Sequence, residues 1–209
     1  MSTRYGIFIV PQPEFTARAY RARQIICGQY GAWAAEMLMI HIMLGGFFPW
    51  AEDGIEALVL GLGNLASESR RHSSPINMDR SDVVVAPDFR GTIFLEFVHP
   101  QGQDPLARLY ENVIGLINSH PGPQPTHQPT AEDFRPRLPL MQFANLPSSV
   151  LSHAEEFAKG VVEDIGVPGA TSAWRLMLAR FHSQAAGESW EPGSWATDIS
   201  WELLSSHAL

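Results

Sequence analysis

The sequence predicts an α+β fold with two related lobes, each a mostly antiparallel sheet that has helices on one side. Three observations lead to this prediction. Strand-like and helix-like segments follow one another in the order β-α-β-α-β-β-α and then β-α-β-β. A proline-rich connector at about 120–131 separates the two series, and each series contains one strand with polar residues inside an apolar run. The 209 residues suffice for a single bilobal domain over residues 1–209 with a sizeable core.

The first series is predicted from hydrophobic periodicity and from turn residues. Short β-rich runs that end at proline or glycine indicate strands, and apolar residues spaced by three or four indicate helices. In the first helix, for example, Phe15, Ala19 and Ala22 share one face. The expected elements are a strand at 5–13, a helix at 14–31, a strand at 36–48, a helix at 51–69, two strands within 82–100 and a helix at 104–119.

The second series follows a connector that has four prolines in nine residues, which indicates an extended segment rather than a helix or a strand. The expected elements after it are a strand at 134–146, a helix at 147–166 and strands at 172–183 and 196–206. The last two strands are separated by a loop rich in Gly, Pro and Trp. We expect the tryptophans of this region to be core and loop anchors rather than platforms on which a base stacks; they are Trp174, Trp190, Trp195 and Trp201.

Composition and charge narrow the class of partner. The formal net charge is -8, and the cations are 13 arginines and the single lysine Lys159. Tight binding of a long nucleic-acid duplex usually requires a net basic surface, because neutralised phosphates supply most of the affinity. An acidic chain therefore argues against long duplex nucleic acid. It leaves room for a small nucleotide or an RNA terminus held by a few local arginines.

Several other site classes and locations are disfavoured by the sequence. The single cysteine, Cys27, cannot form an intrachain disulfide, and we expect it to be packed and inert. The histidines show no HxH or HExxH spacing, so we expect no metal site and no cofactor. The N-terminus enters a strand pattern without a signal-peptide pattern, and no apolar run reaches the ~18 residues of a membrane helix. We therefore expect a cytoplasmic protein that does not contact a membrane.

The two strands with polar residues provide the candidate site. Residues two apart in a strand share a face, so His41 lies on the same face as Met43, and Arg137 on the same face as Arg135 and Pro139. If the two strands lie beside one another across a cleft, His41 and Arg137 face one space. An imidazole that transfers protons near neutral pH and a guanidinium that binds oxyanions would together suit an anionic ligand.

Each candidate also has a structural interpretation. His41 is alternatively a packed core histidine with one backbone partner. Arg137 is alternatively half of an ion pair with Glu132 or Asp133, and Arg135 a solvated residue at the rim. The remaining two positions, Met43 and Pro139, would make the cleft apolar.

Two stretches resemble the paired motifs of the two-histidine phosphoesterase superfamily, which includes the 2′-5′ RNA ligase-like RNA 2′,3′-cyclic phosphodiesterases. "HIMLGGFFP" is similar to the first motif, His-x-Thr/Ser followed by a hydrophobic residue. "FRPRLPLMQF" is similar to the second, aromatic-x-Pro-His-hydrophobic-Thr-hydrophobic. The resemblance implies a bilobal, pseudo-twofold fold around a central cleft, with the N- and C-terminal strands in one lobe.

The resemblance also implies a role for each motif residue, and three of the four motif positions depart from the pattern. His41 keeps the first histidine, whereas Met43 replaces the first Thr/Ser, Arg137 the second His and Pro139 the second Thr. The prediction is a divergent phosphodiesterase acting on a cyclic phosphodiester at an RNA end or in a small nucleotide. His41 would be the acid/base and Arg137 the anion clamp, with Arg135, Met43 and Pro139 lining the ligand. The alternatives are a non-catalytic module that binds a nucleotide, an RNA end or a protein, and an enzyme for a non-phosphate substrate.

Overall fold

The computed structural model describes residues 1–86, 91–100, 104–119 and 133–209. The connector predicted at 120–131 lies outside the described residues. The described chain contains seven strands, four α-helices and two 3-10 helices. In chain order they are β1 (Ser2–Pro11), α1 (Pro13–Tyr30), η1 (Ala34–Met37), β2 (Ile42–Phe48), η2 (Glu52–Gly54), α2 (Ile55–His72), β3 (Asn77–Ala86), β4 (Thr92–Phe97), α3 (Pro105–Asn118), β5 (Arg137–Met141), α4 (Ser148–Asp164), β6 (Ala170–Ser183) and β7 (Ser200–Ala208).

All strand pairs are antiparallel, and they form two groups. In the first lobe, β1 lies between β2 and β6, and β7 extends the other side of β6. In the second lobe, β4 lies between β3 and β5. The 14-residue strand β6 joins the lobes, because its start pairs with β3 before the rest of it pairs with β1. The α+β class is thus confirmed, and the two predicted sheets are continuous through one long strand.

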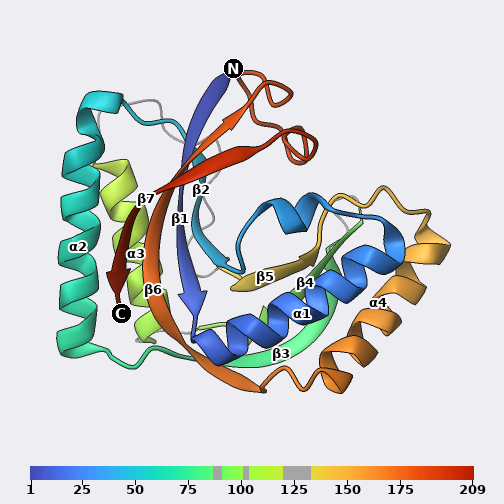
Figure 1. Cartoon of the computed structure of the whole chain (residues 1–209). Coiled ribbons are helices and arrows are strands. Elements are labelled where there is room, and N and C mark those ends of the chain that lie inside the picture. Colours follow the sequence, from blue (N-terminus) through green and yellow to red (C-terminus); the bar gives the residue numbers. More distant parts are fainter. Residues whose placement is uncertain (87–90, 101–103, 120–132) are drawn as a thin grey trace.

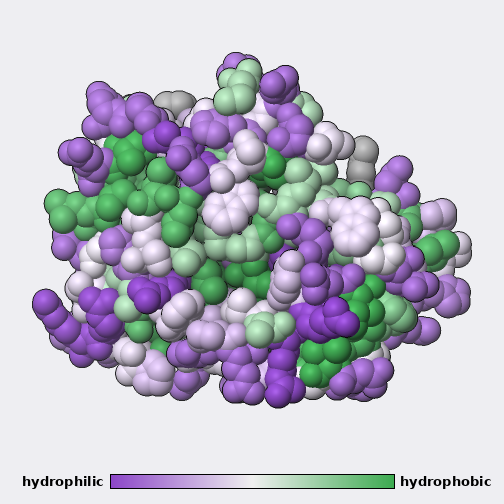
Figure 2. Space-filling model, in the orientation of Figure 1, coloured by the Kyte–Doolittle hydropathy of each residue, from purple (hydrophilic) through white to green (hydrophobic). Residues whose placement is uncertain are grey.

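Each lobe is covered by helices that come partly from the other half of the sequence. Helix α1 follows β1 but packs with α4 against the second lobe, while α3 follows β4 but packs beside α2 against the first lobe (Figure 1). No helix in the described part of the chain is long and apolar enough to cross a membrane. Figure 2 shows apolar side chains gathered over α2, the helix that carries the 67% exposed Leu60.

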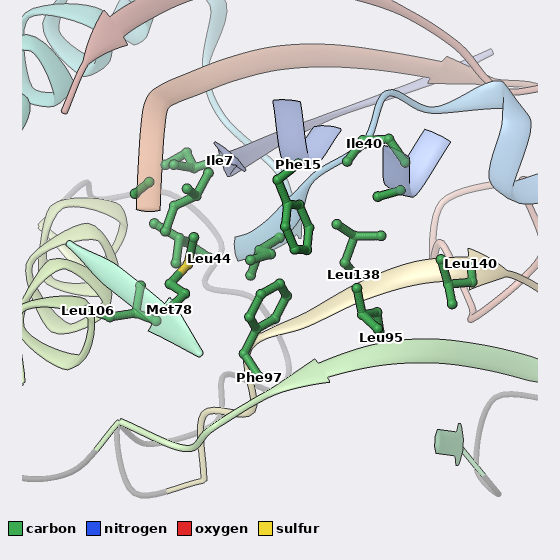
Figure 3. Packing of buried hydrophobic residues seen from close by; sticks show 14 of the residues in the cluster. Ile7, Phe15, Ile40, Leu44, Met78, Leu95, Phe97, Leu106, Leu138 and Leu140 are labelled. Atoms are coloured by element: carbon green, nitrogen blue, oxygen red, sulfur yellow. The ribbon is translucent and has the colours of Figure 1, made fainter. Parts of the chain in front are cut away.

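One large core joins both lobes. Side chains from strands of each lobe and from the covering helices point into it (Figure 3). Ile7 and Leu44 reach it from the first lobe, Leu95 and Leu138 from the second, and Phe15 from α1. At about 25 cal/mol per Å² of apolar surface removed from water, this shared core is the main force that holds the lobes together.

The predicted strand at 36–48 is correct only in its second part. Helix α1 begins with proline in its first turn and ends at Gly31, whose φ of 62° suits a residue without a side chain. The chain then forms η1 and an irregular stretch before β2 starts at Ile42. The reason is the hydrogen bonding of this stretch: the carbonyls of Ala35, Leu38 and Met39 accept from the side chain of an arginine, not from a neighbouring strand.

A second, smaller core lies on the face of the first lobe that turns away from its helices. Strand alternation puts Ile7 and Leu178 on the helix-covered face and Phe8 and Phe181 on the other. The loop between β6 and β7 covers that other face with the buried Trp190 and Trp195, which confirms the predicted anchor role for these two, whereas Trp174 of β6 is 37% exposed. We call this group the aromatic cluster; it consists of Phe8, Phe47, Phe143, Phe181, Trp190 and Trp195.

Replacement of Trp195 by alanine should lower the free energy of unfolding by about 3–5 kcal/mol, the range for removing a buried aromatic side chain. Its ring is 4% exposed and lies between Phe47 and Phe143, with centroid separations of 5.5 and 5.3 Å. Urea denaturation measures the change. Leu203→Ala, at a side chain 48% exposed, is the matched control and should change stability by less than about 0.5 kcal/mol. Equal effects of the two substitutions would contradict this account of the aromatic cluster.

Candidate functional site

His41 lies immediately before β2, at the edge of the aromatic cluster. Its side chain is 3% exposed, and its ring meets Phe8 edge-on at a centroid distance of 4.9 Å. Nδ1 lies 2.7 Å from the carbonyl oxygen of Met39. A carbonyl can only accept a hydrogen bond, so Nδ1 carries the proton and the neutral ring presents Nε2 as an acceptor.

The surroundings of His41 keep the ring neutral. Burial, opposed by the hydrogen bond to Met39 and aided by the positive charge of Arg23, lowers the pKa of His41 from 6.5 to about 4. The imidazole is therefore a proton acceptor at pH 7. Within the described residues Nε2 has no hydrogen-bond partner. The ring is packed, as the structural interpretation expected, but it keeps the atom that a general base needs.

Arg23 of α1 is the side chain that joins the two motif segments. It is 0% exposed, and its Nε and Nη2 both donate to the carbonyl of Pro139, at 3.0 and 2.7 Å. Nη1 donates to the carbonyls of Ala35 and Leu38, at 2.9 and 2.7 Å, and more weakly to that of Met39, at 3.4 Å. One guanidinium thus binds strand β5 and the stretch that leads to His41.

Sequence reasoning missed Arg23. The signal that could have revealed it is helical spacing: Arg23 stands four residues after Ala19 and four before Cys27, on the buried face of α1. Cys27 itself is buried as predicted, with Sγ 3.3 Å from the carbonyl of Leu140. Burial raises its pKa to about 12, so the thiol is inert at neutral pH.

Arg137 is engaged in an ion pair within the second lobe. Its Nε and Nη2 both lie 2.8 Å from Oε1 of Glu96, the residue directly opposite it in the β4–β5 register. The guanidinium also lies 5.7 Å from the centroid of the Phe94 ring. An ion pair was one of the two interpretations of Arg137, and the partner shown by the structure is Glu96, which the sequence did not suggest; Glu132, one of the two acids expected, lies outside the described residues. The two side chains are 33% and 22% exposed, so a ligand can still reach them.

The other predicted positions have separate surroundings. Met43 is half-buried, pairs with Phe8 across β1–β2 and packs against the aromatic cluster. Pro139 is buried, and its carbonyl oxygen accepts two hydrogen bonds from Arg23. Arg135 is exposed, with Nη1 3.1 Å from Nδ1 of His99. The described residues contain no group of three or more His, Cys, Asp or Glu side chains arranged to hold a metal ion.

His41 and Arg137 each lie on the face of their lobe that does not carry the helices. His41 contacts Phe8 on the face of the first lobe opposite its helices. In β5, Arg137 alternates with Leu138, which belongs to the core under α1 and α4. Within the described residues, no hydrogen bond or ion pair joins His41 to Arg137: His41 bonds to Met39, and Arg137 pairs with Glu96.

The fold can now be compared with those of known proteins. No protein-family model and no curated protein sequence matches the chain. Among solved structures, Escherichia coli LigT in complex with 3′-AMP superposes with a TM-score of 0.57 at 13% identity, over 100% of this chain and 99% of LigT. The chain has the fold of LigT.

Two further structures agree with this fold. A protein described as a phosphoesterase gives a TM-score of 0.55 at 13% identity, over 100% of this chain and 99% of its own. LigT in complex with NADP⁺ gives 0.55 at 11% identity, over 99% and 97% of the two chains. The similarity between the two stretches and the paired phosphoesterase motifs is therefore accompanied by a similarity of the whole backbone.

Protonation of His41 should lower the free energy of unfolding in acid. The pKa is about 4 in the folded state and 6.5 in the unfolded chain, so below pH 6.5 the unfolded state binds the proton first. The contribution of His41 is fully present above pH 6.5 and is lost as the pH falls towards 4, by about 3 kcal/mol in total. Urea denaturation of His41→Gln at several pH values should show a flatter dependence between pH 4 and 6.5. His72→Gln, at an exposed side chain, is the control and should keep the wild-type slope.

Proposed function

We propose that this protein is a divergent phosphoesterase that acts on a small cyclic phosphodiester, such as a 2′,3′-cyclic nucleotide or the cyclic phosphate end of an RNA. His41 is the acid/base, and Arg137 is the anion clamp. The observation that supports this most is the tautomer of His41: the bond from Nδ1–H to the carbonyl of Met39 leaves Nε2 as a proton acceptor that no side chain or backbone group of the described residues occupies.

The reaction requires one proton acceptor at the attacking water. Nε2 of His41 removes a proton from water while the water oxygen forms the new bond to phosphorus. The bond from phosphorus to the 2′ or 3′ oxygen of the ribose breaks, and the leaving oxygen takes its proton from solvent. Arg137 cannot supply that proton, because the pKa of a guanidinium in water is above about 12, but it can stabilise charge on the phosphoryl oxygens.

The relatives with this fold are consistent with a small ligand. LigT has been crystallised with 3′-AMP and with NADP⁺. The net charge of -8 also favours a small nucleotide over a long polyanion. Arg135 is exposed, and in this proposal it meets a second phosphate of an RNA end.

The second candidate is a binding module without turnover. Glu96 already holds Arg137, and Met43 and Pro139 offer no hydroxyl to a phosphate. A missing acid/base residue typically lowers a rate by about 10²–10⁴, and each missing hydrogen bond to a charged group weakens binding by about 1.5–3 kcal/mol. These losses would convert an efficient phosphodiesterase into a slow one or into a binder.

The activity test is hydrolysis of 2′,3′-cyclic nucleotides and of an RNA with a cyclic phosphate end. Wild type should turn over, and His41→Ala should lower the rate by about 10²–10⁴ while nucleotide affinity changes little. Because a neutral His41 is required, kcat/KM should rise through a single ionisation near pH 4 and then stay level. His153→Ala, at an exposed histidine of α4, is the control. Absence of turnover in wild type, with nucleotide binding retained, would favour the binding module.

The affinity test concerns the carboxylate that competes for Arg137. In Glu96→Gln the guanidinium is released from its ion pair, so a ligand phosphate no longer has to displace Glu96. A partly exposed ion pair is worth about 0.2–1 kcal/mol, so the dissociation constant for a cyclic nucleotide should fall by roughly 1.5- to 5-fold. Calorimetric titration measures it, with Arg137→Ala as the variant that should lose affinity. Unchanged binding in both variants would show that Arg137 does not meet the ligand.

A further inference from the structure

The buried side chain of Arg23 lies between the two motif segments and contacts both of them. We propose that Arg23 is the positioning residue of the His41 site: it fixes the backbone stretch that orients the imidazole and locks that stretch onto β5. It takes no part in the chemistry, because its N–H groups are already directed at backbone carbonyls. The proposal rests on the proposed function only in taking His41 as the reactive group.

The environment of Arg23 is unusual for a buried cation. The described residues place no carboxylate within ion-pair distance of its guanidinium, and the charge is stabilised by backbone oxygens. Burial lowers the pKa of Arg23 to about 10, while the negative charge of Glu36 opposes this change. Arg23 therefore stays charged at pH 7. A buried charge without a carboxylate in contact is expensive to maintain, and packing alone would be served by an apolar side chain of similar volume.

The geometry of the guanidinium explains why an arginine stands here. Its planar fork reaches the carbonyl of Pro139 with two N–H groups on one side and those of Ala35 and Leu38 on the other. Lysine has three donors on one nitrogen and cannot span both segments in this way.

The connection to His41 runs through one carbonyl. The oxygen of Met39 accepts from Nδ1 of His41 at 2.7 Å and from Nη1 of Arg23 at 3.4 Å. The neighbouring carbonyl of Leu38 accepts from the same Nη1 at 2.7 Å, which fixes the peptide next to it. Displacement of this stretch would move the Met39 carbonyl oxygen, which selects the tautomer of His41. The imidazole ring could then rotate, and Nε2 would no longer point in one fixed direction.

The test compares Arg23→Lys, which keeps the charge and removes the fork, with Arg21→Lys at an exposed position of the same helix. Nitrogen-15 NMR of the imidazole gives the tautomer and the pKa of His41, and circular dichroism verifies the fold. In wild type and Arg21→Lys, His41 should be protonated at Nδ1. In Arg23→Lys the ring should populate both tautomers, and kcat on a cyclic nucleotide should fall by about 10²-fold with KM within a few-fold, as for a misdirected catalytic group.

Arg23→Gln adds an electrostatic measurement. It removes the charge that lowers the pKa of His41, so this pKa should rise, whereas Arg21→Gln should leave it unchanged. An imidazole protonated at Nε2 in wild type would overturn the proposal without any variant. So would an unchanged tautomer, pKa and kcat in folded Arg23→Lys. The NMR readouts need no turnover, so failure of the proposed phosphodiesterase activity and failure of this positioning role remain distinguishable.

Discussion

The structure depends on the contact of Arg23 with strand β5 and with the stretch before His41. Helix α1 brings this arginine from the N-terminal half of the chain to the second lobe, where the apolar core alone would not define which backbone atoms meet. Hydrophobic burial is large but non-directional, so it favours closure of the two lobes without setting their register. The pairing of β6 with β1 and β3 sets it, together with the hydrogen bonds from Arg23 to the carbonyls of Ala35, Leu38 and Pro139. The buried cation therefore selects which backbone atoms come into contact, and an apolar side chain in its place would not make that selection.

The same contact explains how His41 can keep a single tautomer although its neighbours are apolar side chains. An imidazole beside Phe8 and the aromatic cluster would ordinarily lose its orientation, because aromatic packing does not distinguish the two ring nitrogens. The carbonyl of Met39 distinguishes them, and Arg23 helps to hold that carbonyl in place. Burial then keeps the ring neutral, so the acceptor is available over the physiological pH range.

The order of elements was predictable because each helix and strand has its own periodicity and its own stop residues, as α1 shows with its buried face and Gly31. The first part of the strand prediction, at 36–41, was wrong because backbone carbonyls of this region accept hydrogen bonds from the side chain of Arg23, which lies 12 to 15 positions earlier in α1 and not in a strand. The Glu96 partner of Arg137 was missed for a related reason. Which acid faces an arginine depends on the β4–β5 register, and residues 41 positions apart carry no local sign of it.

The lost motif residues change how such a site can hold a phosphate. A threonine or serine hydroxyl gives a directed hydrogen bond, and the positions of both hydroxyls are occupied here by Met43 and Pro139. Two positive charges can still attract an anion. One is Arg137, which is also paired with Glu96, and the other is Arg23, which acts only at a distance because its N–H groups bond to backbone carbonyls. Charge attraction is less directional than a hydrogen bond and is screened by salt when solvent reaches the pair. Under the proposed function, the ligand is therefore distinguished by its single small anionic group rather than by the pattern of its phosphate oxygens.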